Sequence, residues 1–210
     1  WTVKPQIPLE DASVEEQMEV LKETEKAVIS APLNMKLVAR FFDLMGETEE
    51  KIFVNSEGAM IHGTVPRLRF FTLLTGVSNK GSIQRWYTKG QSGGWEVMKQ
   101  WNVPEATLGE AKMMSEILEK AETPPRDEVD MVLGSEIVGI ICHESCGHPQ
   151  EADRILGREA AQAGESYLKP NMIGFKVGSE HVTVVDDPTL PHSYGYYDYD
   201  DEGVRARKRV

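Results

Sequence analysis

Two histidines and a glutamate stand together in one short stretch, His143-Glu144-Ser145-Cys146-Gly147-His148. Neutral imidazoles are good ligands for Zn²⁺, and a carboxylate beside a metal-bound water can take its proton, as in hydrolytic zinc sites. Peptide-bond hydrolysis is the commonest reaction of such a set. The residue types therefore predict that His143 and His148 are metal ligands for zinc and that Glu144 is the catalytic base.

The spacing of the two histidines is wider than usual. In His-Glu-x-x-His the imidazoles are four residues apart and diverge by ~40° around a regular α-helix, whereas five residues apart they diverge by ~140°. On an undisturbed helix His143 and His148 would not converge on one ion. Gly147 and Pro149 are placed to loosen or end the helix, so we expect a bend that brings His148 back toward His143.

The motif has plainer interpretations as well. Histidines in an apolar segment can be hydrogen-bonded core residues, and a six-residue pattern occurs by chance in unrelated chains. The two cysteines, Cys142 and Cys146, lie near the limit of disulfide geometry, which favours free thiols in a reducing compartment. Cys146 could complete a His/His/Cys metal set, but we favour inert, buried thiols at both positions.

The N-terminal part is predicted to be a helix followed by an antiparallel β-meander. A capping box at Ser13 and Glu16, with apolar residues at helical spacing, predicts a helix over residues 14–29. Short β-rich runs separated by turn residues then predict strands at 37–45, 51–54, 59–65, 67–77, 83–88 and 95–101. The basic residues of the meander are expected on a solvated face, without a functional role: Arg67, Arg69 and Arg85.

A second helix over residues 108–121 precedes the likeliest linker, Pro124-Pro125. Beyond it we expect a strand at 128–133, a helix capped by Ser135 that is buried because it is apolar on nearly all faces, and a strand at 182–185. The predicted class is α+β, with an N-terminal substrate or interaction portion (1–123) and the start of a second portion (128–210). In the second portion the buried, motif-bearing helix packs on a sheet.

Composition excludes several functional classes. The net charge is −11, with 34 acidic against 23 basic residues, so a nucleic acid would be repelled. No apolar run approaches the ~20 residues that cross a bilayer, and no signal peptide is evident, so we expect no membrane partner and a cytoplasmic location. Trp1 is not an initiator methionine and residues 204–210 read as the start of a strand, which predicts a truncated chain.

At this point the sequence resembles a known family, the TldD/PmbA proteins, and more closely the TldD branch. The hallmark of that branch is His-Glu-x-x-Gly-His followed by Glu-x-Asp, which here is His143 to Asp153. A second match runs from Val182 to Pro188, followed by Asp200-Asp201-Glu202-Gly203. The resemblance is strongest over residues 128–205.

The resemblance implies a zinc-dependent metalloprotease that cleaves small or unstructured peptides, in maturation or degradation. It implies that His143 and His148 bind zinc, that Glu144 activates the zinc-bound water, and that the third ligand is a cysteine far downstream. Because no cysteine follows Cys146, we expect that ligand beyond Val210. Glu151 and Asp153 match the family and would accept hydrogen bonds from the ligand imidazoles or act at a helix end.

The implied partners are a peptide substrate and a paralogous TldE/PmbA-like subunit without the histidine motif, or a second copy in a homodimer. The alternative function is a non-catalytic partner or scaffold subunit in which the motif is structural, and iron or manganese could replace zinc. His62, His181 and His192 are expected to be ordinary exposed histidines. The segment from Tyr194 to Asp201 is expected to be a solvated turn rather than a calcium or peptide site.

Overall fold

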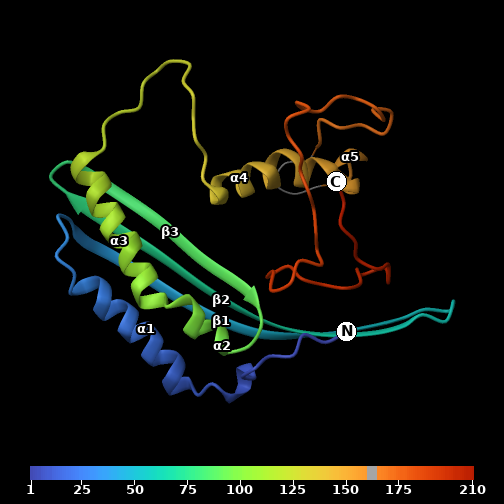
Figure 1. The fold of residues 1–210 in the computed structure, drawn as a ribbon, viewed down its shortest axis with the longest axis horizontal. Helices are drawn as coiled ribbons and strands as arrows, with labels where there is room; N and C mark the ends of the chain where they lie inside the picture. The colour runs from blue at the N-terminus through green and yellow to red at the C-terminus, as the bar shows by residue number, and fades with distance from the viewer. Residues whose placement is uncertain (160–164) are drawn as a thin grey trace. The chain divides into compact units, whose positions relative to one another are not determined.

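The computed structural model describes residues 1–159 and 165–210. Its elements are the turn η1 (Leu9–Asp11), α1 (Val14–Ile29), β1 (Lys36–Val54), β2 (Met60–Ser78), β3 (Gly81–Ser92), α2 (Glu96–Trp101), α3 (Val103–Lys120), α4 (Ser135–Cys142), η2 (His143–Gly147), η3 (His148–Gln150) and α5 (Ala152–Ile155) (Figure 1). The chain forms two compact units: unit 1 is Trp1–Pro124 with Pro188–Arg207, and unit 2 is Pro125–Asp187 with Lys208–Val210. The predicted α+β class is confirmed.

Helix α1 begins and ends where the sequence predicts. The Ser13 hydroxyl accepts the backbone N–H of Glu16 (3.1 Å), and the Glu16 carboxylate accepts the N–H of Ser13 (2.9 Å). These bonds satisfy two of the N–H groups that a helix start leaves without partners. Val28, on the stripe that faces the sheet, is fully buried.

The meander has three long antiparallel strands in the order β1-β2-β3, and not the six short strands predicted. Pro66 was expected to separate two strands, yet β2 continues through it. The Pro66 carbonyl accepts the N–H of Gly93 (2.9 Å) and so points away from β1. The N–H and C=O of one residue in an antiparallel strand point to the same side, so the N–H that Pro66 lacks would also point away from β1. Because β3 pairs with β2 only from Arg67 onward, the proline removes no ladder hydrogen bond.

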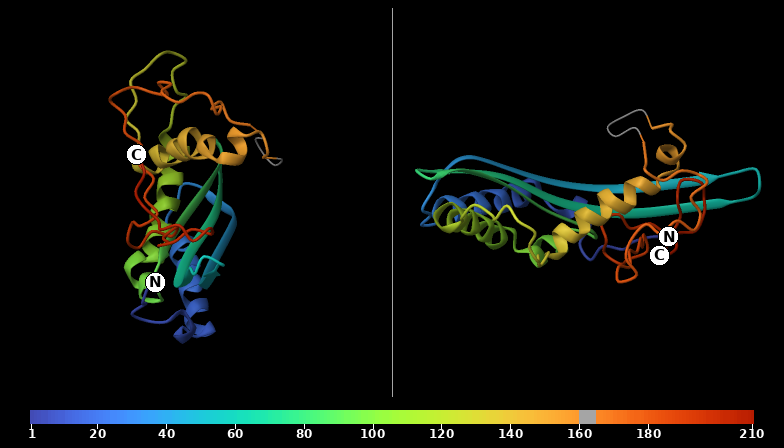
Figure 2. Two further views of the ribbon diagram at one scale, coloured as in Figure 1. Left: turned by 90° about the vertical axis from the view of Figure 1, so that its right-hand side faces the viewer. Right: turned by 90° about the horizontal axis from the view of Figure 1, so that it is seen from above.

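One face of the sheet is covered by α1 and α3, as two perpendicular views agree (Figures 1 and 2). Along β2 alternate side chains are buried beneath these helices: Leu68, Phe70, Thr72 and Leu74. The opposite face carries a row of ring contacts across the three strands, from Phe41 to Phe71 and from Phe71 to Trp86. Because successive side chains of a strand point to opposite faces, the sheet has one buried face and one more open face.

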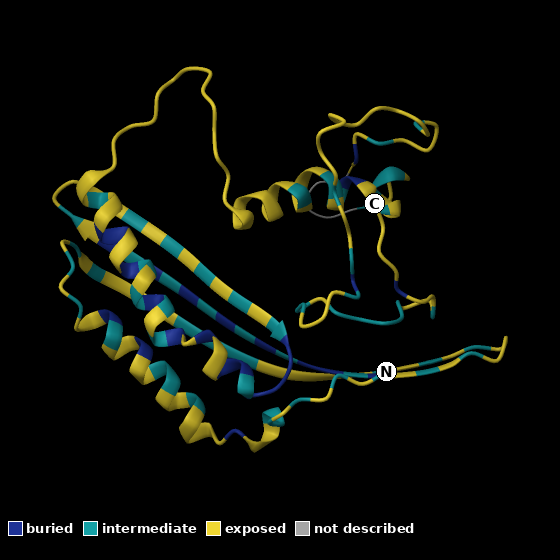
Figure 3. Cartoon of the chain, in the orientation of Figure 1, coloured by how far each residue is buried: buried dark blue, intermediate teal, exposed yellow. Residues whose placement is uncertain are grey.

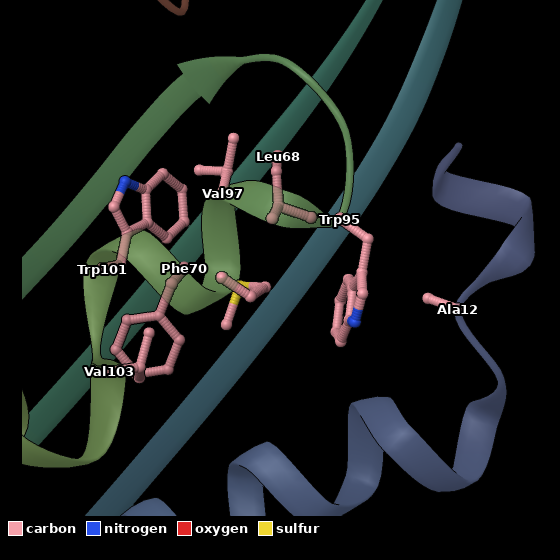
Figure 4. Packing of buried hydrophobic residues seen from close by; sticks show 8 residues of the cluster. Ala12, Leu68, Phe70, Trp95, Val97, Trp101 and Val103 are labelled. Atoms are coloured by element: carbon pink, nitrogen blue, oxygen red, sulfur yellow. The ribbon is translucent and has the colours of Figure 1, made fainter. Parts of the chain in front are cut away.

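Residues 95–101, predicted as a strand, are instead the short helix α2 and the residue before it. A short apolar run does not distinguish a buried helix from a strand by its pattern alone. Here Trp95, Val97 and Trp101 turn into one core with Phe70 and other residues of the sheet (Figure 4). The packing of large aromatic side chains over the end of the sheet explains the helical conformation.

Glu96 fixes the start of α2 to the N-terminal segment. Its carboxylate accepts the backbone N–H groups of Ile7 (2.9 Å) and Gly94 (3.0 Å). Burial by itself would raise the pKa of Glu96, but these backbone hydrogen bonds outweigh it and lower the pKa below the ordinary value. The ionised carboxylate is therefore part of the folded structure of unit 1.

Helix α3 begins at Val103, five residues before the predicted start. Asn102 adopts the left-handed conformation (φ 44°) and forms the junction at which α2 ends and α3 begins. Ala111 and Met114 lie on the buried stripe of α3, with Val28 and Leu74 in the same cluster. The second predicted amphipathic helix is thus confirmed over most of its length.

All three strand arginines form ion pairs, and that of Arg69 is with Asp43 (3.0 Å). Arg67, with 11% of its side chain exposed, pairs with Glu49 (2.5 Å) and donates to the carbonyls of Tyr194 (2.8 Å) and Tyr196 (3.2 Å). Arg85 pairs with Glu110 of α3 (2.7 Å). The expectation of a solvated face is therefore wrong for Arg67, which holds the segment Pro188–Arg207 against β2 within unit 1.

Unit 2 departs most from the predictions. Residues 128–133 and 182–185 are not strands. The strand predicted to start at 204–210 is represented only by isolated bridges, at Arg205 in unit 1 and at Arg209 in unit 2. Gly134, and not Ser135, is the N-cap of α4. The prediction that α4 is buried on a sheet is also wrong, because Ile140 is 52% exposed and the other large residues of α4 are exposed too.

The exposure of α4 follows from how little of unit 2 is packed. Among its described residues only Pro149 and Ser166 are buried, so no apolar surface of the described part covers the helix (Figure 3). None of the helices in the described part of the chain is both long and apolar enough to cross a membrane.

Candidate metal centre

The motif lies on a widened helical turn that continues α4. Residues His143–Gly147 form the π-turn η2, in which the N–H of His148 donates to the carbonyl of His143 five residues earlier. Pro149 explains the widening, because it has no N–H to donate and its ring would clash with the carbonyl of Ser145 in a regular helix. Gly147 keeps right-handed helical angles (φ −63°, ψ −69°), so the helix widens here and does not end at the glycine.

The wider turn brings together the three side chains predicted from the sequence. The ring centroids of His143 and His148 are 4.3 Å apart, with the ring planes at 80°. One possible ligand atom from each of His143, Glu144 and His148 lies within 4.8 Å of the other two. On a regular helix the ~140° divergence would separate the two imidazoles, so the extra residue in the turn makes the spacing usable.

His148 is oriented by a carboxylate. Its Nδ1 atom lies 2.7 Å from Oε1 of Glu151, and the second oxygen of Glu151 accepts the Nε–H of Arg154 (2.5 Å). With Nδ1–H donating to Glu151, Nε2 is the nitrogen that can bind a metal, an arrangement common around metal-ligating histidines. The hydrogen bond from His148, and then that from Arg154, keep the pKa of Glu151 below its ordinary value.

The sequence left two roles open for Glu151 and Asp153, a hydrogen bond to a ligand imidazole or one at a helix end, and each residue takes a different one. Glu151 contacts the imidazole of His148, as described. Asp153 lies in the first turn of α5, where its carboxylate accepts the backbone N–H of Arg154 (2.8 Å). Asp153 is therefore a helix-terminal hydrogen-bonding residue in this structure.

Two residues that the sequence did not point to donate hydrogen bonds to backbone carbonyls in the motif turn and just after it. The Ser166 hydroxyl donates to the carbonyl of Pro149 (2.6 Å), and the Tyr167 hydroxyl donates to the carbonyl of Ser145 (3.2 Å). In a regular helix the Ser145 carbonyl would accept an N–H from residue 149, which is a proline. A serine and a tyrosine about twenty residues from the motif carry no sequence signal that could have revealed these contacts.

A cavity of about 650 Å³ within unit 2 adjoins the motif. One wall comes from α4 and the motif turn and includes His143 and Gly147; the other comes from Val184–Asp186 and Arg209–Val210. Both cysteines are free thiols and line this cavity in a half-buried state, so the expectation that they are core residues is wrong. Cys146 is not part of the group formed by His143, Glu144 and His148.

The remaining histidines stand apart from the motif group. His62 is exposed and pairs with Glu50 (2.8 Å), and His181 is exposed in unit 2. His192 has a left-handed backbone (φ 64°), and its carbonyl accepts the N–H of Ser92 (3.3 Å). In the described part of the chain, neither His181 nor His192 belongs to a group that could hold a metal.

The donor set fits a divalent metal of the zinc type. Two imidazoles and a carboxylate converge, and one imidazole is held in the orientation that leaves Nε2 available. Nitrogen donors of this kind suit zinc, and a site with few protein ligands leaves room for water or substrate. The chemistry of the group is thus compatible with a catalytic metal.

Comparison with known proteins decides the family. The PmbA/TldA metallopeptidase central domain matches residues 7–123, and the PmbA/TldA metallopeptidase C-terminal domain matches residues 126–210. The chain belongs to the PmbA/TldD metallopeptidase family. The family resemblance inferred from the motif is therefore confirmed.

Relatives in the family carry metalloprotease names. A metalloprotease of Archaeoglobus fulgidus is 33% identical over 96% of this chain and 43% of its own length, and one of Methanocaldococcus jannaschii is 33% identical over 95% and 41%. The zinc metalloprotease TldD homolog of Saccharolobus solfataricus is 37% identical over 42% of this chain and 18% of its own length. The chain thus spans less than half the length of the curated relatives it matches.

Proposed function

We propose that this chain carries the zinc-binding and proton-transferring residues of a peptidase that hydrolyses small or unstructured peptides. The observation that carries the proposal is the π-turn, which brings His143, Glu144 and His148 to one point despite their unusual spacing. The family match supports a metallopeptidase, and the name of the Saccharolobus solfataricus relative supports zinc.

In this proposal each residue of the group has one role. His143 and His148 hold the metal, and Glu151 keeps the His148 ring oriented through Nδ1. Zinc, when bound, supplies a Lewis acid that polarises the scissile carbonyl and makes water more acidic. Glu144 takes the proton from the attacking water and later passes it to the leaving amine.

The remaining ligand and the partners are further parts of the proposal. We propose that the third protein ligand is the downstream cysteine implied by the family resemblance, since Cys146 is not grouped with the motif side chains. We also propose a paralogous subunit without the motif, or a second copy, as the protein partner. The exposed apolar residues of α4 support this, because such a helix is more stable when covered.

The decisive experiment replaces Glu144 by glutamine in the intact protein. We expect elemental analysis to find about one zinc per chain in the variant, as in the wild type, while peptide hydrolysis falls by about 10²- to 10⁴-fold, the usual contribution of a general base. Glu180→Gln is the matched control, because Glu180 is an exposed glutamate of unit 2 outside the cavity.

Two outcomes would contradict the proposal. A zinc-loaded Glu144→Gln variant that cleaves at the wild-type rate would remove Glu144 from the reaction. A wild-type protein that binds zinc with four protein ligands and cleaves no peptide would favour the scaffold alternative, because a structural zinc site is closed. The same elemental analysis distinguishes zinc from iron and manganese.

A further inference from the structure

Part of the cavity beside the motif is apolar and has no role in the proposed reaction. On the side of α4 and the motif turn it is lined by small groups, Gly139, Cys142 and Cys146. Val184 and Val185 line it on the other side. A free thiol packs as a small apolar group, so all of these residues present apolar surface to the cavity. We call them the apolar subsite.

The apolar subsite adjoins the proposed metal ligands. His143 and Gly147 of the motif line the same cavity, which has a volume of about 650 Å³. Gly139 lies four residues before His143 and Cys146 three residues after it, spacings that place residues on one face of a helix. A peptide whose scissile bond lay at the metal would therefore have a neighbouring side chain within reach of the subsite.

Gly139 keeps the helical side of the subsite open. A Cβ atom at this position would meet no heavy atom within 4 Å, apart from the neighbouring residues and the backbone of α4 itself. Glycine weakens the interior of a helix relative to alanine, so its presence here does not help α4 to form. A larger side chain at residue 139 would instead take up space in the cavity.

The charged residues around the subsite are engaged in ion pairs. Glu151 pairs with His148 and Arg154, and Asp186 pairs with Arg209. These groups therefore need no charge from a ligand. A polar side chain that entered the subsite would lose hydration without gaining a partner from the apolar groups, whereas an apolar side chain gains free energy by leaving water.

We propose that the apolar subsite binds one large aliphatic or aromatic side chain of the substrate, next to the scissile bond. The peptidase would then prefer peptides with such a residue at that position. The inference rests on the proposed peptidase function and adds the class of substrate. A cavity of about 650 Å³ has the size of pockets that hold small ligands, so one large side chain fits with the backbone beside it.

The first test measures binding separately from cleavage, in the zinc-loaded Glu144→Gln protein. The probes are an N-acetylated alanine hexapeptide amide and its versions in which one leucine, or one asparagine, replaces each alanine in turn. Leucine and asparagine have similar shapes and differ in polarity. We expect one leucine peptide to bind about 10- to 100-fold more tightly than its asparagine counterpart, as for an apolar pocket. The cleavage site of that peptide in the wild type identifies the position that the subsite reads.

Two variants in the same background test the residues of the subsite. Gly139→Leu fills the space, so we expect the preference for leucine to shrink to about threefold or less. Val184→Thr keeps the shape of the wall but adds a hydroxyl, which should lower the preference by about threefold or more. Gly109→Leu is the matched control, because Gly109 is a helical glycine of α3 in unit 1 that also has open space at its Cβ position. Thermal unfolding and zinc content confirm that each variant is folded and loaded.

The two thiols give a measurement that depends on neither hydrolysis nor affinity. Cys142 and Cys146 line the subsite, so a bound side chain should shield them from alkylation by N-ethylmaleimide. We expect the preferred leucine peptide, at a saturating concentration, to slow the labelling of both residues about tenfold or more, in line with the occupied fraction of the site. Mass spectrometry of the fragment that contains both cysteines reads the labelling.

The inference is overturned if no leucine peptide is preferred, if the preference persists in both Gly139→Leu and Val184→Thr, or if the bound peptide leaves both thiols equally reactive. None of these results touches the peptidase function, which fails only if the wild-type protein cleaves none of the peptides or if Glu144→Gln remains active. A preference that is lost equally in Gly109→Leu would also overturn the role of the subsite.

Discussion

In unit 1 apolar side chains of β2 lie beneath α1 and α3, whereas in unit 2 an equally apolar helix, α4, stays exposed. Unit 1 is held mainly by burial. The motif turn of unit 2 is held by local contacts: the π-turn, the carboxylate of Glu151 and the hydroxyls of Ser166 and Tyr167. The comparison indicates that ligand geometry can be set over one turn of backbone, without a core formed by the described residues around it.

The largest effect that would sharpen this contrast is expected from the core of unit 1. Phe70→Ala removes a side chain with no exposed surface and should lower the free energy of unfolding by about 3–5 kcal/mol. In the isolated chain, with no partner on α4, Ile140→Ala should change it by less than about 0.5 kcal/mol, as for a surface residue. Hydrogen exchange, read for each unit separately, measures both changes. An equal cost for the two variants would mean that α4 is covered in solution.

The second largest effect is expected at Glu151, whose replacement should weaken zinc binding and leave the stability of unit 1 unchanged. Glu151→Gln weakens the bond that orients His148, so we expect zinc affinity to fall roughly 10- to 100-fold. Competition with a chromophoric chelator measures the affinity. The tryptophans all lie in unit 1, so their fluorescence should report an unchanged unfolding transition. Unchanged zinc affinity would remove Glu151 from the centre.

Pro149→Ala tests whether the proline causes the widened turn. With an N–H at residue 149 and no ring clash, the turn can return to a regular α-helix, and the imidazoles would then diverge. We expect zinc affinity to fall at least about tenfold, or ~1.4 kcal/mol. The far-ultraviolet circular dichroism should gain helical signal. If zinc affinity and helicity both match the wild type, another cause must hold the π-turn.

The smallest effect is expected from a polar contact in unit 1. Glu96→Gln weakens the hydrogen bonds to Ile7 and Gly94 and should cost about 1 kcal/mol at pH 7. Because the pKa of Glu96 is lowered in the folded state, its contribution is complete above the ordinary value of 4.5 and is lost as the pH falls through the lowered pKa. Urea unfolding at several pH values should show the two proteins converging in acid. A constant difference down to pH 2 would contradict this assignment.

Sequence reasoning succeeded where a local pattern determined the structure. The capping box fixed the start of α1, and helical periodicity identified α3. It failed for residues 95–101, where a short apolar run permits either conformation and tertiary packing decides. It also divided β1 and β2 too often, because Gly46 and Pro66 are turn residues in isolation but are tolerated inside long paired strands.

For the candidate site, residue types and spacing indicated the need for a bend between His143 and His148. They did not indicate the form of the bend, because a π-turn has no sequence signature beyond the proline that follows it. Ser166 and Tyr167 were missed because their contacts join residues about twenty positions apart in the chain. The burial of α4 was predicted from its composition alone, which does not say what surface is available to cover it.

Pro66 also has a consequence for aggregation. Beyond it β1 and β2 run on as a two-stranded ribbon without β3, and a second edge of this kind invites pairing with a neighbouring molecule. At its first exposed position the proline offers no N–H for such pairing. The N-terminal residues occupy the next position of β2, where Val3 donates its N–H to the carbonyl of Thr64 (2.9 Å) and Thr64 donates its N–H to the carbonyl of Trp1 (3.0 Å). Pairing with a neighbouring molecule is therefore hindered along this part of β2.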